Sequence, residues 1–279
     1  ELVAEMADNP QRYTMDGENR ELTVLFADVR GFTAISEQLA PAALREYINE
    51  YLTAMSHDIR DSHGGTLDKY IGDAVMAFWG APVAFPDHAS RAVASALLMQ
   101  QSAARLNGQF AARGWPPLRI GIGINTGPMH VGDMGSRIRR AYTVMGDSVN
   151  LAARLEGASK RYGVGIVVGP ATRAAAAEFL YRELDLVRVL GKQEAVAIFE
   201  PRCRQADATP AELAQLERWH AALARLRACE WPAAGALIAQ LRADFPDDGL
   251  YRLYGARVED YLRTPPVSGW DGVTVLDSK

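Results

Sequence analysis

The sequence predicts an α/β fold of the α+β kind, in which helices pack on a mixed β-sheet in the order βαββαβ, followed by a helical appendage. Three observations support this prediction. Apolar runs with β-type periodicity alternate with amphipathic helical runs as far as residue 202. Glycine or proline stands at many of the junctions between these runs. Beyond residue 202, apolar residues recur mainly at helical spacing.

Local signals place several element boundaries. Gly64-Gly65 follows the end of a long helical run, as glycine commonly does. Gly72-Asp73 predicts a tight turn between two strands. Asp87 is a candidate N-cap for one helix, and Asp147 or Ser148 for another.

The expected elements follow from these signals. In the first part of the chain we expect a strand from residue 21 to a turn at residue 31, a helix over 42–63, and strands over 66–70 and 74–79. In the middle we expect a helix over 87–113, a strand over 118–125, a loop or hairpin over 126–141, and a strand over 142–145. The last part should contain a helix from residue 147 or 148, a strand over 164–168, a helix after residue 170, and strands over 182–189 and 195–200. The glycines within 118–125 indicate a strand with a close-packed glycine face rather than a dinucleotide loop.

The chain is expected to divide into three regions. Residues 1–20 are polar and are expected to form a linker or coupling segment. Residues 21–202 are expected to form the main domain. Residues 203–279 are expected to form three helices, a tetratricopeptide-like unit plus one helix, that pack on the main domain or on a partner. Their polar tail from Ser268 is expected to order only by docking.

Composition excludes several classes of protein. Of the 279 residues, 48% are hydrophobic and 23% charged, and the formal net charge is −4, so general affinity for nucleic acid or anionic membranes is not expected. Cys203 and Cys229 are expected to be reduced thiols. No apolar run approaches the ~20 residues that span a bilayer, and no signal peptide is visible. Because the chain begins at Glu1, we expect a piece of a longer protein.

Two aspartates are candidate metal ligands. Asp28 ends an apolar strand, and Asp73 lies in a turn beside another strand. Carboxylates in such places suit Mg²⁺ in phosphoryl or nucleotidyl transfer. Gly31 would let the backbone approach phosphate oxygens, and the turn after it could point N–H groups at them. Taken alone, an aspartate at a strand end is most often a turn or cap residue.

Two further pairs are candidate substrate contacts. Asn150 and Arg154 are four residues apart on an expected helix and share a face, so they could contact a ribose and a phosphoryl group. Lys69 can only donate a hydrogen bond, whereas Thr143 can donate or accept. Together they would satisfy the acceptor N1 and the 6-amino donor of adenine.

Together these blocks closely resemble the catalytic domain of class III adenylate cyclases, in particular the bacterial subgroup with lysine and threonine as the purine-selecting pair. The resemblance covers roughly residues 20–202 and rests on the segments 26–33, 64–73 and 142–154. It implies a ferredoxin-like βαββαβ sandwich. It also implies that Asp28, Asp73 and the Val29 carbonyl hold two Mg²⁺ or Mn²⁺ ions per site.

The resemblance assigns the remaining site residues. Lys69 and Thr143 match the adenine-binding pair, and Asn150 and Arg154 the pair that orients the ribose and stabilises the transition state. The expected triphosphate contacts are Gly31, Phe32, Thr33, Arg139 and Lys192. Arg137 and Arg140 lie close enough to leave the choice of arginine open. Where many members carry Lys-Gly-Lys, this chain has Leu190-Gly191-Lys192, so the first lysine is missing.

The resemblance implies that the chain converts ATP to 3′,5′-cyclic AMP and pyrophosphate, as a head-to-tail homodimer in which each site takes residues from both chains. A cytoplasmic catalytic domain is expected, and similar cyclases often carry an upstream membrane-anchored sensor. The alternatives are a guanylate cyclase, a non-catalytic nucleotide-sensing or dimerisation module, and an RNA-binding βαββαβ domain. The last would need a basic surface, which the net charge of −4 disfavours.

Overall fold

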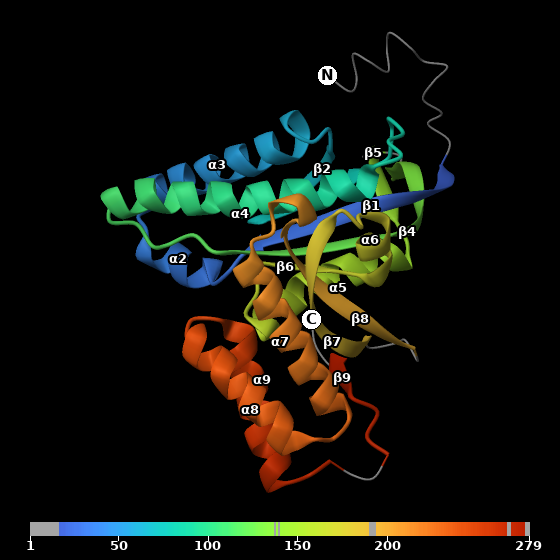
Figure 1. The fold of residues 1–279 in the computed structure, drawn as a ribbon. Helices are drawn as coiled ribbons and strands as arrows, with labels where there is room; N and C mark the ends of the chain where they lie inside the picture. The colour runs from blue at the N-terminus through green and yellow to red at the C-terminus, as the bar shows by residue number, and fades with distance from the viewer. Residues whose placement is uncertain (1–16, 137, 139, 190–193, 267–268, 277–279) are drawn as a thin grey trace.

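The computed structural model describes residues 17–136, 138, 140–189, 194–266 and 269–276. Within this part of the chain one mixed sheet forms the centre of the molecule, with the strand order β2-β3-β1-β4-β6-β8-β7-β9 and with β5 paired to β4 (Figure 1). The strands are β1 (Glu18–Val29), β2 (Thr66–Ile71), β3 (Ala74–Trp79), β4 (Ile120–Gly135), β5 (Arg140–Met145), β6 (Ile166–Val168), β7 (Phe179–Val189), β8 (Ala195–Arg204) and β9 (Val273–Leu276).

The helices connect and cover these strands. They are α2 (Phe32–Gln38), α3 (Pro41–Ser56) with a π-helical turn (His57–Asp61), α4 (His88–Ala112), α5 (Asp147–Tyr162), α6 (Pro170–Ala175), α7 (Pro210–Arg227), α8 (Trp231–Asp244) and α9 (Gly249–Arg263), with a short 3₁₀ turn at Gln205–Asp207. The predicted βαββαβ order is confirmed, because β1, α2 with α3, β2, β3, α4 and β4 follow one another along the chain. In the sheet β2, β3, β1 and β4 are neighbours in that order and pair antiparallel.

Strand β1 is buried on both faces, and its side chains alternate between two layers. Leu25 and Ala27 face the core under α3 and α4, which lie together on one side of the sheet (Figure 1). Leu22 and Val24 instead pack with Val149 at the start of α5. This alternation is the period-2 pattern of a strand inside a two-sided sandwich.

Helix α5 approaches the sheet closely at the predicted glycine face. A Cβ atom on Gly123 would lie 2.1 Å from the backbone nitrogen of Glu156 and 2.3 Å from the carbonyl oxygen of Ala152. Only glycine leaves room for the helix backbone at that distance. The expected close-packed glycine face of this strand is therefore confirmed.

The prediction of a loop or hairpin over 126–141 is corrected in its first part. Strand β4 continues to Gly135 and pairs with β1 as far as Val131. The chain turns back into β5 only after Gly135. Val144 of β5 belongs to the same buried cluster as Val24 and Met76, so β5 packs over β1 and β3. The strand periodicity is not visible in this stretch because it is rich in glycine.

Three local predictions differ from the structure. Helix α2 was not expected between residues 31 and 41. Asp87 occupies the N-cap position of α4 but its side chain bonds to Arg91 instead of a helix N–H. Helix α5 has Gly146 at its N-cap, so neither Asp147 nor Ser148 caps it.

The C-terminal helices share a core with the sheet. Trp219 and Tyr254 are fully buried in a cluster that also contains Tyr162 of α5 and Leu184 of β7. The predicted polar tail includes β9, which pairs parallel with β7. Strand β1 begins at Glu18 and β8 ends at Arg204, so both strands cross the region boundaries expected at residues 20 and 202.

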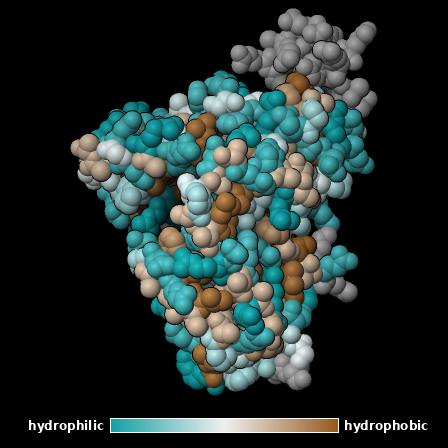
Figure 2. Space-filling view, viewed as in Figure 1, coloured by the Kyte–Doolittle hydropathy of each residue, from teal (hydrophilic) through white to brown (hydrophobic). Residues whose placement is uncertain are grey.

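The outer surface is mixed in character. Figure 2 shows hydrophobic side chains in small groups among hydrophilic ones on the face in view. No helix in the described part of the chain is long and apolar enough to cross a membrane.

Candidate active site

Asp28 and Asp73 lie together at one end of β1. Ala27 of β1 pairs with Val75 of β3, which places Asp28 next to the β2–β3 turn that carries Asp73. The pKa of Asp28 is raised to about 6, first by burial and then by the hydrogen bond and the charge of Asp73. The backbone N–H of Val29 donates to Asp28 Oδ1 at 2.9 Å and partly offsets this rise in pKa. Two carboxylates thus converge where a cation would relieve their repulsion.

The donor set at this point fits a hard divalent cation. Carboxylate oxygens, with a backbone carbonyl such as that of Val29, are the ligands that Mg²⁺ and Mn²⁺ accept, and Mg²⁺ commonly uses only one or two carboxylates together with phosphate oxygens. Among the described residues no group of three or more His, Cys, Asp or Glu side chains could hold a metal. Asp28 and Asp73 supply two oxygen ligands of the kind that such a cation accepts.

Glu156 and Arg30 lie near the aspartate pair, and the sequence did not identify them as site residues. The pKa of Glu156 is raised to about 7, first by burial and then by the charge of Asp28. Arg30, whose own pKa burial lowers, donates to Ser159 Oγ at 3.0 Å. The signal in the sequence was a charged residue on the inward face of α5, four residues after Ala152 and three before Ser159.

Lys69, Thr143 and Asp68 form a second cluster. Lys69 Nζ lies 3.4 Å from Thr143 Oγ1, and Thr143 donates to Asp68 Oδ2 at 2.5 Å. Lys69 also lies 3.3 Å from Asp68 Oδ1. Because β5 packs over β1 and β3, Thr143 reaches Lys69 although β2 and β5 are not neighbours in the sheet. The structure thus brings together the two residues expected to contact a purine and adds Asp68.

Asn150 and Arg154 project from the outer side of α5. Both are exposed, whereas Val149, Ala152 and Leu155 of the same helix are buried. Their spacing of four residues places them on one face, as expected. Tyr70, Ile71 and Met145, large apolar side chains next to the site residues in sequence, are also exposed.

The expected triphosphate contacts are only partly within the described residues. Gly31 has φ of 70° and is the N-cap of α2, so Phe32 and Thr33 form its first turn. The left-handed conformation at this turn explains why glycine stands there. Arg139 and Lys192, with Leu190 and Gly191, lie outside the described residues.

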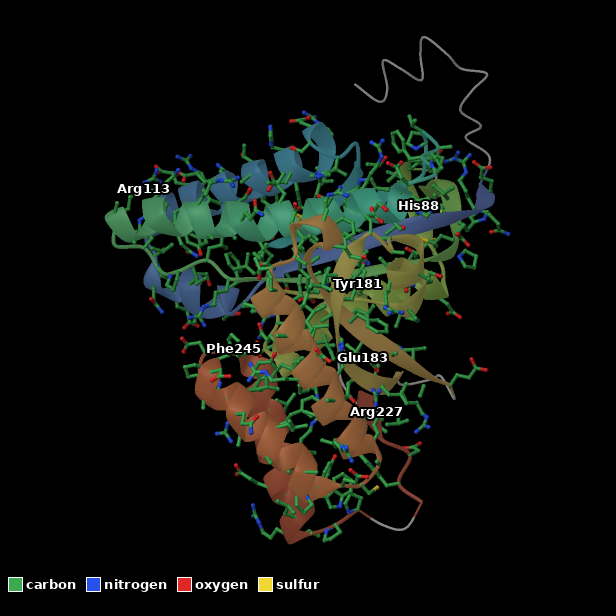
Figure 3. All side chains as sticks on the ribbon, in the orientation of Figure 1. His88, Arg113, Tyr181, Glu183, Arg227 and Phe245 are labelled. Carbon is green, nitrogen blue, oxygen red and sulfur yellow. The ribbon has the colours of Figure 1, made fainter. Side chains whose placement is uncertain are left out.

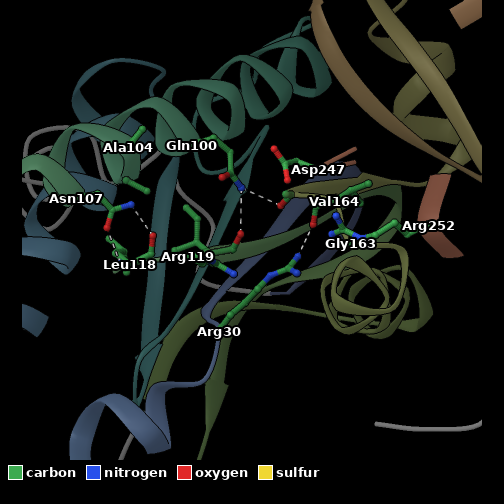
Figure 4. A pocket seen from close by; sticks show the side chains of 13 residues that line it. Arg30, Gln100, Ala104, Asn107, Leu118, Arg119, Gly163, Val164, Asp247 and Arg252 are labelled. Carbon is green, nitrogen blue, oxygen red and sulfur yellow. Dashed lines mark hydrogen bonds between the residues drawn. The ribbon is translucent and has the colours of Figure 1, made fainter. Parts of the chain in front are cut away.

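A separate pocket of about 610 Å³ lies between α4, the start of β4 and the loop before α9 (Figure 4). Its polar side chains bond mainly to backbone. Gln100 donates to the carbonyl oxygens of Ile120 and Gly165, and Asn107 both donates to and accepts from Leu118. Arg30 also lines this pocket and donates to the Val164 carbonyl (Figure 4). The bonds of Gln100 and Asn107 join α4 to the sheet region, which indicates a structural role for these two side chains.

Comparison with known proteins gives a consistent result. The family described as the adenylate and guanylate cyclase catalytic domain matches residues 15–199. Adenylate cyclase from Anabaena cylindrica is 38% identical over 190 residues, which cover 65% of this chain and 36% of that protein. Adenylate cyclase 1 from Rhizobium meliloti is 36% identical over 182 residues, covering 65% of this chain and 27% of that protein. The chain thus spans about a third of the length of these relatives.

Solved structures share the fold. The crystal structure of the adenylyl cyclase CyaB from P. aeruginosa is 37% identical, with a TM-score of 0.64, and the match covers 70% of this chain and all of that one (100%). The guanylyl cyclase Cya2 is 36% identical, with a TM-score of 0.62, covering 69% of this chain and 97% of that one. Overall similarity therefore does not separate the two purine specificities.

Proposed function

The chain belongs to the adenylate and guanylate cyclase catalytic domain family, and on that premise we propose that it converts ATP to 3′,5′-cyclic AMP and pyrophosphate. The observation that carries the proposal is the cluster of Lys69 and Thr143, since a lysine and a threonine hydroxyl suit the hydrogen-bonding edge of adenine. The similarity to proteins named adenylate cyclase supports the same choice.

The nucleotide cyclases of this family depend on a metal, and Asp28 and Asp73 with the Val29 carbonyl are the residues proposed to hold it. We propose two Mg²⁺ or Mn²⁺ ions per site. Bound there, such ions would favour ionisation of the ribose 3′-hydroxyl and neutralise charge on the phosphates. The pair of carboxylates contributes by fixing the position of the triphosphate relative to the ribose.

Asn150 and Arg154 are proposed to act on the reacting part of the substrate. Asn150 would hold the ribose so that the 3′-oxygen lies in line with the α-phosphorus and the departing pyrophosphate. Arg154 would donate hydrogen bonds to the α-phosphoryl oxygens as negative charge builds on them. Gly31, Phe32, Thr33, Arg139 and Lys192 are proposed to bind the β- and γ-phosphates.

A head-to-tail homodimer is proposed to complete each site. One chain would supply Asp28 and Asp73, and its partner Lys69, Thr143, Asn150 and Arg154. The exposure of Asn150 and Arg154 supports this, as does the exposure of Tyr70, Ile71 and Met145, because apolar side chains beside a site are commonly covered in an assembly. A two-fold arrangement would produce two equivalent sites.

The main competing function is guanylate cyclase activity, since a guanylyl cyclase structure is among the similar ones. A non-catalytic nucleotide-binding module is the second. Purified chain would be assayed for cyclic product from ATP and from GTP, with Mg²⁺ and with Mn²⁺. Cyclic AMP formation that Asp28→Ala abolishes supports the proposal. Preference for GTP would favour the first competitor, and ATP binding without product would favour the second.

The setting of the domain is also a proposal. We place the catalytic region in the cytoplasm, and an upstream membrane-anchored sensor in a longer parent protein would supply its input. Proteolytic mapping and localisation of the full-length protein would test this.

A further inference from the structure

The direction of one hydrogen bond determines what Thr143 offers a base. We propose that Asp68 is a positioning residue that turns Thr143 into a hydrogen-bond acceptor toward the purine and thereby makes the site select ATP over GTP. The inference rests on the proposed function and extends it to a residue with no assigned role.

The hydroxyl of Thr143 has one proton, and its hydrogen bond to Asp68 uses that proton. Thr143 Oγ1 donates to Asp68 Oδ2 at 2.5 Å, within the range of a charge-assisted O–H···O⁻ bond. A carboxylate can only accept, so the proton of this bond belongs to Thr143. Thr143 Oγ1 then has only its two lone pairs left for further hydrogen bonds. One of these faces Lys69 Nζ at 3.4 Å, and in the proposed complex the other would accept from the base.

Burial of Asp68 stabilises its hydrogen bond with Thr143. The side chain of Asp68 is 0% exposed and that of Lys69 is 44% exposed. Asp68 Oδ1 has no hydrogen bond to any described residue but lies 3.3 Å from Lys69 Nζ. A buried carboxylate needs such partners, so Asp68 cannot release the Thr143 proton without losing a hydrogen bond.

The backbone of β2 is irregular at this residue. The pairing of β2 with β3 shifts between Leu67 and Lys69, so Asp68 is an extra residue in the strand. Successive residues in a regular strand point to opposite faces, whereas a bulge re-aims a side chain. The bulge explains how Asp68 and Lys69, although consecutive, both reach Thr143.

The two purines respond differently to a fixed acceptor. Adenine presents a 6-amino donor, which the lone pair of Thr143 can accept. Guanine presents the acceptor O6 at the same place, which would leave two acceptors facing each other. A free threonine hydroxyl could rotate and donate to O6. Asp68 prevents that rotation, so the discrimination depends on a residue that does not touch the base.

Asp68→Asn tests the inference. The amide oxygen would face Lys69, and the amide NH₂ would then donate to Thr143 Oγ1, which frees the hydroxyl proton for the base. We expect the ratio of kcat/KM for ATP to that for GTP to fall about 10-fold or more, the effect of one base-reading hydrogen bond. Asp244→Asn, a surface carboxylate paired with Arg218, is the matched control and should leave the ratio unchanged.

A double-mutant cycle shows whether Asp68 acts on the base through Thr143 or through a general change in the structure. In a Thr143→Val background, Asp68→Asn should cause no further change in the ratio. An unchanged ratio in Asp68→Asn alone, or an equal change in both backgrounds, would overturn the inference. If the wild-type chain makes no cyclic product, the proposed function fails, and the ratio of dissociation constants for the α,β-methylene analogues of ATP and GTP tests Asp68 instead. Binding of neither analogue would overturn both.

Discussion

Arg182 of β7 and Asp248 at the start of α9 form an ion pair, with 2.6 Å between Nη1 and Oδ2. The side chain of Arg182 is 2% exposed and also binds Glu200 of β8 at 2.7 Å. Asp248 in turn accepts from the backbone N–H groups of Leu250 and Tyr251, so it caps α9. A single buried guanidinium therefore joins two strands of the sheet to the first turn of the last helix.

Removing this guanidinium should destabilise the whole molecule. Arg182→Met removes the cation shared by Glu200 and Asp248 and leaves the buried Glu200 with the partly exposed Arg202, so we expect the free energy of unfolding to fall by about 3 kcal/mol. Arg218→Met, which breaks the exposed pair with Asp244, is the control and should cost at most ~1 kcal/mol. Urea unfolding at neutral pH measures both. Equal losses would show that the buried pair has no special role.

Two glycine substitutions should have opposite effects. Gly123→Ala puts a methyl group 2.1 Å from the backbone of Glu156, so α5 must move away, and both stability and cyclase activity should fall. Gly157→Ala, on the exposed side of α5, meets nothing within 4 Å and should stabilise the helix by about 0.5–1 kcal/mol. Thermal unfolding and turnover of ATP would be compared. A neutral Gly123→Ala would contradict the close approach of α5.

Arg154 should affect the chemical step. Arg154→Ala is expected to lower kcat by about 10²–10³-fold, because a preorganised donor to the α-phosphoryl oxygens is lost. Lys160→Ala, on the exposed surface of the same helix, should leave kcat unchanged. Steady-state kinetics with ATP would show the difference. A rise in KM with kcat intact would mean that Arg154 only binds the substrate.

The shared site can be tested by mixing inactive chains. Asp73→Ala damages one half of each site and Asn150→Ala the other. A random dimer formed from equal amounts should regain about a quarter of wild-type activity, since half the dimers have one intact site of two. Each variant alone, and a mixture of Asp73→Ala with Asp28→Ala, should stay inactive. Failure of the first mixture to regain activity would exclude complementary sites.

His88 should make stability depend on pH. Its Nδ1 lies 2.7 Å from the hydroxyl of the fully buried Thr23, and burial lowers the pKa of His88 below 6.5 (Figure 3 shows its position). The unfolded chain therefore binds the proton more readily than the folded one. Stability is full above about pH 6.5 and is lost as the pH falls through the folded pKa. In His88→Asn, this part of the slope between pH 7.5 and pH 5 should disappear from unfolding curves. An unchanged slope would show that His88 does not contribute to the pH dependence of stability.

Periodicity predicted most of the fold because it reports which faces are buried. The run of Leu118, Ile120, Ile122 and Ile124 specified a strand, and the leucines and tyrosines near residue 254 specified helices. The extension of β4 through 126–135 was not predictable, since glycines and a proline there mask the alternation. Helix α2 has only seven residues, too few to show a period.

The site was predictable in parts. Asp28, Asp73, Lys69 and Thr143 were named from short patterns because each stands beside a turn or in a distinctive run. That Thr143 meets Lys69 depends on how β5 packs over β1 and β3, which local sequence does not encode. Asp68 and Glu156 were missed for the same reason: their partners are distant in sequence. Glu183 of β7 and Arg227 of α7 are a further pair with distant positions in the sequence: they form an ion pair with 2.7 Å between charged atoms, and Figure 3 labels both.

The core shared by α5, β7 and the last three helices determines where this chain can be cut. The family likeness ends at residue 199, yet Tyr162, Leu184 and Trp219 bury one another across that limit. A fragment trimmed to the matched region would present the apolar side of the sheet to water and would be expected to aggregate. We therefore expect the smallest unit that folds to be larger than the matched region, and expression of the catalytic region should keep the C-terminal helices.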